Sequence, residues 1–181
     1  MGGSVSAAGA AQETAKFALG PTCAVFDDLG NRFLCDNRHP CRQVMLEDWY
    51  TKRNPFLVVR DVVHDVCAPA EQSKVYPLSK AWTTSTLHAG QFTAACGVLV
   101  YRGNRLFKGE HRHIFVCEPT GNLVHHEVAR WGRSMSNTES IAAFYGQPVE
   151  ERRDFLATPD EWFRPVDLVN GPDGSLYVVD M

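Results

Sequence analysis

A tight turn between two apolar runs near the C-terminus most strongly constrains what this chain can fold into. Residues 171–174 read Gly-Pro-Asp-Gly, in which proline pre-sets φ, aspartate can bond its own backbone and Gly174 accepts a positive φ. The run that follows, Leu-Tyr-Val-Val over residues 176–179, is rich in aromatic and β-branched residues. The stretch 162–180 therefore predicts strand, tight turn and strand.

Two earlier segments repeat this turn and strand, each with an aromatic residue and a final acid. They end at Asp36 and Glu118, and their aromatic residues are Phe33 and Phe115, which match Tyr177. Phe33 and Phe115 are 82 residues apart, and Phe115 and Tyr177 are 62 apart. Because propeller blades take roughly 40 to 50 residues, these gaps suit about two blades, then about one blade with an insertion. The pattern predicts an all-β fold: a partial β-propeller of about two to three four-stranded antiparallel blades, with long loops and minor helix.

Turn signals and apolar runs place further elements. Short turns predict hairpins, and a strand is expected before Gly103-Asn104. Helix is expected in two short places, one of them with proline at its first position, and one long stretch reads as an inserted surface loop. The predicted strands are 32–36, 41–47, 95–102, 114–118 and 123–128; the helical turns are 138–145 and 158–162; the loop is 130–152.

Composition limits the function classes. The chain has 181 residues, enough for one domain with a real core, and a net charge of −3 with scattered basic residues argues against nucleic-acid binding. No apolar run approaches the roughly 18 residues of a membrane span, and the Ala/Gly/Ser-rich start does not resemble a secretory signal. Motifs of Rossmann dehydrogenases, P-loop enzymes, zinc proteases and α/β-hydrolases are absent. We expect a disordered lead-in over 1–18 and a domain over 19–181.

The six cysteines show no Cys-x-x-Cys spacing, so a zinc ribbon, a thioredoxin-like site and a haem attachment are unsupported. An even number permits disulfides in an oxidising compartment. Cys96 and Cys117, however, stand in apolar runs, where a cysteine is commonly a small buried hydrophobe. Both interpretations stay open.

The loop 87–97 combines small residues and two glycines with His88 at its edge. Such a backbone can approach a ligand closely, and His88 could then act as a general base on an alcohol. The alternative is a tightly packed entry to a strand, with His88 held by a hydrogen bond.

Three other candidates have equally plain structural alternatives. His39, in the turn 36–39, could line the mouth of a channel or belong to a hairpin held by Asx-type bonds. Arg102 and Arg164 flank strands and could bind a carboxylate or quinone oxygen, although single arginines usually lie at the surface.

The histidine pairs are weaker signals. His111 and His113 point the same way on a strand, but no acid or cysteine accompanies them at a metal-binding spacing, so no metal site is predicted. His125 and His126 are adjacent, so on a strand they face opposite sides and at most one can line a site.

Several motifs occur in an order that resembles a bacterial β-propeller family, the PVC-type membrane-bound dehydrogenase domains, which are similar to soluble glucose and sorbosone dehydrogenases. The resemblance runs from about residue 19 to the end, and two positions depart from it: Leu29 replaces a usual tryptophan, and His126 a common arginine. The segments that carry it are 27–33, 36–40, 52–55, 75–77, 88–97, 100–103, 115–119, 122–125 and 162–166.

The resemblance implies a propeller followed in the parent protein by helical repeats and often a c-type cytochrome segment. It implies oxidation of a small sugar or alcohol with pyrroloquinoline quinone and calcium, an extracytoplasmic or periplasmic location, and membrane association through the parent. His88 would be the base, Arg102 and Arg164 the cofactor or substrate contacts, and His39 and His125 the channel-mouth residues.

Two functions are thus expected as alternatives. The first is a fragment, truncated at both ends and inactive alone, of a quinone-dependent dehydrogenase that passes electrons to haem, although the chain itself has no haem motif. The second is a non-catalytic propeller that binds a glycan or a protein partner. Unpaired strand edges of an unclosed propeller would favour association in either case.

Overall fold

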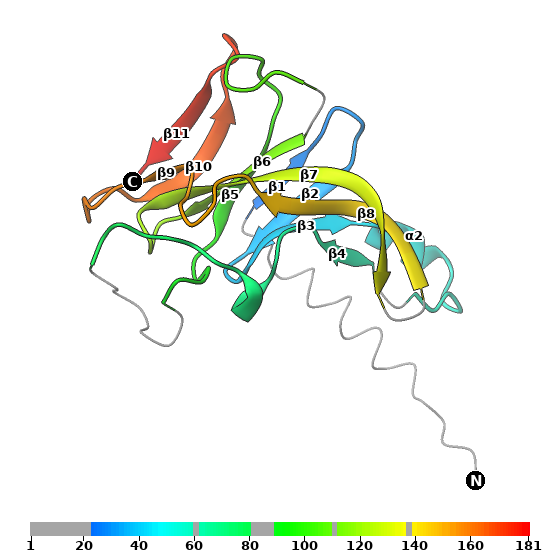
Figure 1. Ribbon diagram of the computed structural model, residues 1–181. Coiled ribbons are helices and arrows are strands. Elements are labelled where there is room, and N and C mark those ends of the chain that lie inside the picture. The colour runs from blue at the N-terminus through cyan, green and yellow to red at the C-terminus, as the bar shows by residue number, and fades with distance from the viewer. Residues whose placement is uncertain (1–22, 60–61, 81–88, 110–111, 137–138) are drawn as a thin grey trace.

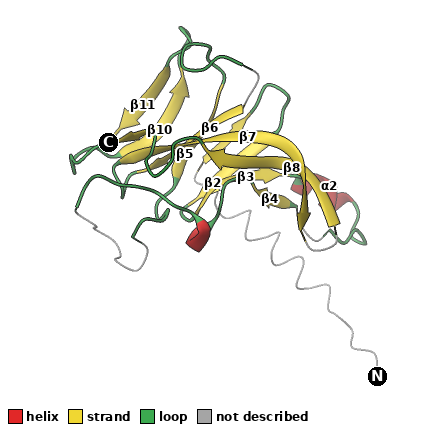
Figure 2. Cartoon of the chain, viewed as in Figure 1, coloured by secondary structure: helices red, strands yellow, loops and turns green. Residues whose placement is uncertain are grey.

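The computed structural model describes residues 23–59, 62–80, 89–109, 112–136 and 139–181 (Figure 1). These residues form mostly antiparallel β-structure with one short α-helix and one 3-10 turn (Figure 2). The expected lead-in over 1–18 lies outside the described residues. Among the residues described, no helix is long and apolar enough to cross a membrane.

The first sheet is a four-stranded meander in chain order. Its first turn is closed by Asp27, whose Oδ1 accepts hydrogen bonds from the backbone N–H of Leu29 at 2.9 Å and of Asn31 at 2.8 Å. Gly30 takes the positive φ of +82° that this turn requires. The elements are β1 (Cys23–Phe26), β2 (Arg32–Asp36), β3 (His39–Val44), α2 (Asp48–Arg53), β4 (Val63–Asp65) and the 3-10 turn η1 (Ala70–Gln72).

The second sheet has five strands and contains the longest pairing in the molecule. One edge of β7 pairs with β6. The other edge of β7 pairs with β9 at the first residues of β7 and with β8 from Glu127 onwards. Figure 1 shows β7 and β8 as a long curved ribbon that reaches towards α2. The strands are β5 (Cys96–Tyr101), β6 (Arg112–Glu118), β7 (Leu123–Ser136), β8 (Glu139–Pro148) and β9 (Leu156–Ala157).

This pairing overturns two predictions. The helix expected over 138–145 and the surface loop expected over 130–152 are wrong, because β7 and β8 occupy most of that stretch as strands. The hydrogen bonds of a strand pair outweigh the helix propensity of a short alanine-containing segment. The helical turn expected over 158–162 is also wrong, since this segment forms only a hydrogen-bonded turn from Asp160 to Phe163.

The third sheet is the hairpin that the C-terminal turn predicts. It consists of β10 (Pro165–Asn170) and β11 (Leu176–Asp180). Gly174 has a φ of +80°, and Asp173 Oδ1 accepts the Ser175 N–H at 3.0 Å. In Figure 1 this hairpin lies at the end of the molecule away from α2.

The repeated aromatic and acid occupy one structural position, the second strand of each sheet. Asp36, Glu118 and Asp180 are the last residues of β2, β6 and β11. Glu118 accepts the N–H of Ala94 at 3.0 Å, and Asp180 accepts the N–H of Arg164 at 2.6 Å. Each of these two acids therefore binds the backbone that leads into the first strand of its own sheet.

The core lies between the sheets, which stack in chain order. Alternate residues of β5 and β6 face opposite ways, as strand geometry requires. One set, including Val100 and Ile114, packs against Phe33 of the first sheet. The other set, including Phe115, packs against Leu168 of the third sheet. The second sheet is therefore covered on both faces.

The predicted strands are largely confirmed, and the all-β class with minor helix is confirmed. The sheets have four, five and two strands, however, and are not two to three complete four-stranded blades. The described part of the chain closes no ring of blades.

Candidate functional site

A cavity of about 480 Å³ opens between the segment after η1, the strands β7 and β8, and the loop after β8. We call it the His125 cavity. Among the side chains that line it are Ser73, Tyr76, Phe92, His125 and Glu127. Its rim also carries Lys74, Glu150, Glu151, Arg152 and Arg153.

Strand geometry and one distant loop bring the polar groups of the His125 cavity together. His125 and Glu127 are two residues apart on β7, so their side chains point the same way. Asp154, 29 residues beyond His125, returns from the loop after β8 and places Oδ1 2.6 Å from His125 Nδ1. Its Oδ2 accepts the N–H of Tyr76 at 2.6 Å, which fixes the carboxylate.

His125 is held between two carboxylates. Its Nε2 lies 3.2 Å from Glu127 Oε1, and its Nδ1 contacts Asp154. Burial alone lowers the pKa of His125, but the hydrogen bonds to Asp154 and Glu127 outweigh burial and raise this pKa to about 9. The ring is therefore an imidazolium at neutral pH and is not available as a general base.

Glu127 has one oxygen with no hydrogen-bond partner among the described residues. Oε1 meets His125, whereas Oε2 is buried and accepts no hydrogen bond from the described residues. The buried thiol of Cys67 also faces this carboxylate. A side chain at position 146 would collide with Oε2, so Gly146 is what allows β8 to pass this carboxylate. A buried acceptor without a partner is rare in folded proteins and calls for an explanation, such as a bound molecule.

His126 faces the opposite side of β7, as the alternation predicts. It is fully buried, and its ring stacks on Phe115 with centroids 4.5 Å apart. Its Nε2 lies 2.9 Å from His113 Nδ1, and its Nδ1 lies 3.2 Å from Glu150 Oε1. Burial lowers the pKa of His126, which is the opposite direction to the shift of its neighbour His125.

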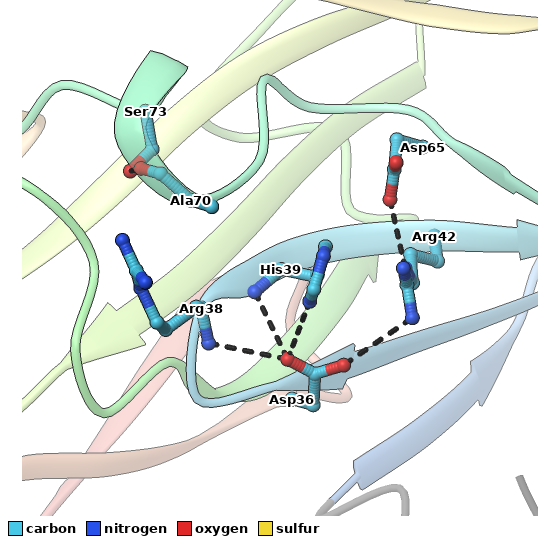
Figure 3. Close-up of polar contacts among 7 residues, drawn as sticks. All are labelled: Asp36, Arg38, His39, Arg42, Asp65, Ala70 and Ser73. Carbon is cyan, nitrogen blue, oxygen red and sulfur yellow. Dashed lines mark hydrogen bonds and ion pairs between the residues drawn. The ribbon is translucent and has the colours of Figure 1, made fainter. Parts of the chain in front are cut away.

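The turn that carries His39 is a hairpin built around Asp36 (Figure 3). Asp36 Oδ1 accepts the backbone N–H of Arg38 at 3.2 Å and of His39 at 3.1 Å, and it lies 2.7 Å from His39 Nδ1. Asp36 Oδ2 faces Arg42, whose Nε donates to Asp65 at 2.7 Å. The bonds to the two backbone N–H groups are the Asx-type bonds of the interpretation in which His39 belongs to a hairpin turn. Burial raises the pKa of Asp36, but the hydrogen bonds from His39 and Arg38 outweigh burial and lower this pKa.

The other predicted residues are dispersed. His88 lies outside the described residues. Arg102 is half exposed, forms an ion pair with Asp28 at 3.2 Å and lines a second cavity of about 370 Å³. Arg164 donates through Nη1 to the carbonyl of Pro119 at 2.7 Å. His39 and Arg164 line neither of these two cavities, so His125 is the predicted residue that the larger cavity contains.

Sequence reasoning missed Glu127, Gly146 and Asp154. The alternate spacing of His125 and Glu127 on a predicted strand is a signal that could have identified Glu127. Asp154 has no such signal, because it belongs to the loop beyond a strand that was itself predicted as loop. In the part of the chain that the structure describes, no three His, Cys, Asp or Glu side chains are arranged to hold a metal ion.

The fold and the cavity define an antiparallel β-protein whose stacked sheets carry a buried imidazolium between carboxylates. A family model described as a domain of unknown function, DUF7133, matches residues 10–181. The chain belongs to this family. The chain has no match among the curated proteins or among the solved structures.

Proposed function

We propose that this chain is the part of a β-propeller that binds a small, neutral polyhydroxylated compound of the sugar class in the His125 cavity. The observation that carries the proposal is the buried, unpartnered Oε2 of Glu127 beside the His125 imidazolium. A ligand hydroxyl would give this oxygen the hydrogen bond it lacks.

The order and packing of the sheets support a propeller. Successive antiparallel sheets stack face to face in chain order, and β5 contacts both β1 and β10, the first strands of the neighbouring sheets. The second strand of each sheet repeats the aromatic residue and final acid. Blades arranged around a common axis have these features.

The lining of the His125 cavity supports a neutral polyhydroxylated ligand. Basic and acidic side chains are mixed around the cavity, so no single charge sign dominates. Phe92 and Tyr76 provide aromatic surface, and Glu127 provides an acceptor. A volume of about 480 Å³ falls within the usual range for small-ligand sites.

Binding is favoured over catalysis at this cavity because the proton on His125 is held by two carboxylates. Oxidation of the ligand, the dehydrogenase-like alternative, is favoured by the ordered motifs that resemble quinone-dependent propellers. In that case the base would be His88, and pyrroloquinoline quinone and calcium would be supplied in the parent protein, which we place outside the cytoplasm. Dye reduction by the full-length parent with quinone, calcium and a panel of sugars and alcohols tests this alternative.

Calorimetric titration with neutral sugars and polyols tests the binding proposal. We expect at least one compound to bind the wild-type chain and to lose at least tenfold in affinity in Glu127→Gln, which replaces the unpartnered oxygen by an amide N–H₂. Glu161→Gln is the matched control, because Glu161 is exposed and outside the cavity. No binding by any compound, or equal binding by Glu127→Gln, would refute the proposal.

A further inference from the structure

The six cysteines lie in neighbouring pairs. Cys96 of β5 is directly opposite Cys117 of β6 in the antiparallel register. Cys23 of β1 is likewise opposite Cys35 of β2. The remaining two, at positions 41 and 67, are joined through a backbone hydrogen bond of 3.2 Å. A chain that used cysteine only as a small apolar residue would have no reason to place all six this way.

The register of β5 and β6 places Cys96 and Cys117 opposite each other, just before an irregularity of the ladder between Cys96 and Leu99. Residues directly opposite each other in an antiparallel pair have Cα atoms about 4.5 to 5.5 Å apart, and disulfides span about 4.4 to 6.8 Å. Opposed side chains also lie on the same face of the sheet, and Cys96 packs against the core cluster that contains Cys117. The structure has both residues in the reduced form.

We propose that Cys96 and Cys117 form a cross-strand disulfide that fastens β5 to β6 under oxidising conditions. With oxidised glutathione as the oxidant, the Cys96 thiolate attacks one glutathione sulfur and releases one glutathione thiolate. The Cys117 thiolate then attacks Cys96 Sγ in the mixed disulfide and releases the second glutathione. Two protein thiols lose two protons and two electrons in total, and one glutathione disulfide becomes two thiols.

The bond should form while the chain folds. Cys117 is fully buried in the folded protein, whereas Cys96 is half-buried. Burial, with Cys23 close by, raises the pKa of Cys96 to about 12, so little thiolate exists in the folded state near neutral pH. In the unfolded chain both thiols have ordinary pKa values and are accessible to glutathione.

The sequence makes the pairing easy to map. Basic residues separate the cysteines so that trypsin places each of the six in a different peptide. Cys96 falls in 81–102 and Cys117 in 113–130. A disulfide joins these two peptides into one species that is two hydrogens lighter than their sum.

The experiment is refolding of the reduced, full chain in a buffer of reduced and oxidised glutathione. Remaining thiols are then alkylated, the protein is digested without reduction and the peptides are identified by mass spectrometry. We expect the joined peptides 81–102 and 113–130 in wild type and in the matched control Cys23→Ser/Cys35→Ser. Folding of each sample is verified by a cooperative urea transition.

Recovery of either peptide alkylated and unjoined from folded wild-type protein overturns the proposal, as does linkage of Cys96 to any other cysteine. A second measurement does not depend on mapping. The urea midpoint of refolded wild type should fall when dithiothreitol is added, and that of Cys96→Ser/Cys117→Ser should not. An equal response of the two proteins contradicts the proposal.

Discussion

The His125 imidazolium predicts a specific dependence of stability on pH. In the unfolded chain His125 has an ordinary pKa of 6.5, and in the folded chain its pKa is about 9. Between these values the folded state holds one proton more than the unfolded state, so the unfolding free energy decreases as pH rises. The stabilisation is complete below pH 6.5 and is lost as pH passes through about 9.

The size of the effect follows from the same shift. Each pH unit within this window changes the unfolding free energy by about 1.4 kcal/mol, so the full shift corresponds to about 3 kcal/mol. Other titrating groups limit the useful window, among them His126 below it and buried thiols such as Cys67 above it. Burial lowers the pKa of His126, so its contribution falls below pH 6.5. Burial raises the pKa of Cys67 above 9.0, so its contribution begins near pH 9.

Urea unfolding at several pH values between about 6.5 and 8.5 measures the effect. We expect wild type to lose about 2 to 3 kcal/mol across this range and His125→Gln to lose little. Asp154→Asn, which keeps the imidazole but removes one carboxylate, should lower the folded-state pKa and shift the loss towards lower pH. A flat profile for wild type, or a wild-type slope for His125→Gln, would refute the assignment of this pH dependence to His125.

Three other substitutions test the packing around the site. Gly146→Ala should destabilise the protein by about 1 to 3 kcal/mol in urea unfolding, because the new methyl group displaces the Glu127 carboxylate. The same displacement should weaken sugar binding, and unchanged binding would contradict this. Phe115→Ala should cost about 3 to 5 kcal/mol in urea unfolding, since Phe115 is fully buried between two sheets, and a loss below 1 kcal/mol would argue against that packing. Glu118→Ala should lower the free energy of unfolding by about 2 to 3 kcal/mol, because the N–H of Ala94 loses its acceptor. Glu118→Gln keeps an amide oxygen and should lower it by less. Equal losses for the two variants in thermal or urea unfolding would contradict this role of Glu118.

Local signals predicted the parts of the fold that local chemistry decides. The turn at Gly174 needs a positive φ, and the apolar runs around Phe33, Phe115 and Tyr177 have strand composition, so the hairpins could be identified from the sequence. The long β7–β8 pair could not, because residues 130–152 mix polar and apolar residues without a clear strand alternation and contain alanines that also suit a helix. Its strand state depends on pairing between segments, which no local pattern records.

The site was predictable to a smaller extent. His125 was recognised as a candidate, and the prediction that His125 and His126 face opposite sides of a strand is confirmed. Asp154 reaches His125 only because β8 and its following loop return to β7, so its role depends on tertiary structure. His88 remains a prediction, since it lies outside the described residues.

Nitrogen-15 NMR of the histidine side chains tests the central claim most directly. At about pH 7.5, between the unfolded and folded pKa values of His125, we expect an imidazolium signal for His125. Addition of the neutral sugar that binds should shift this signal in wild type and not in Glu127→Gln. A neutral His125 ring at this pH, or a wild-type signal that no sugar or polyol moves, would contradict the proposed binding site.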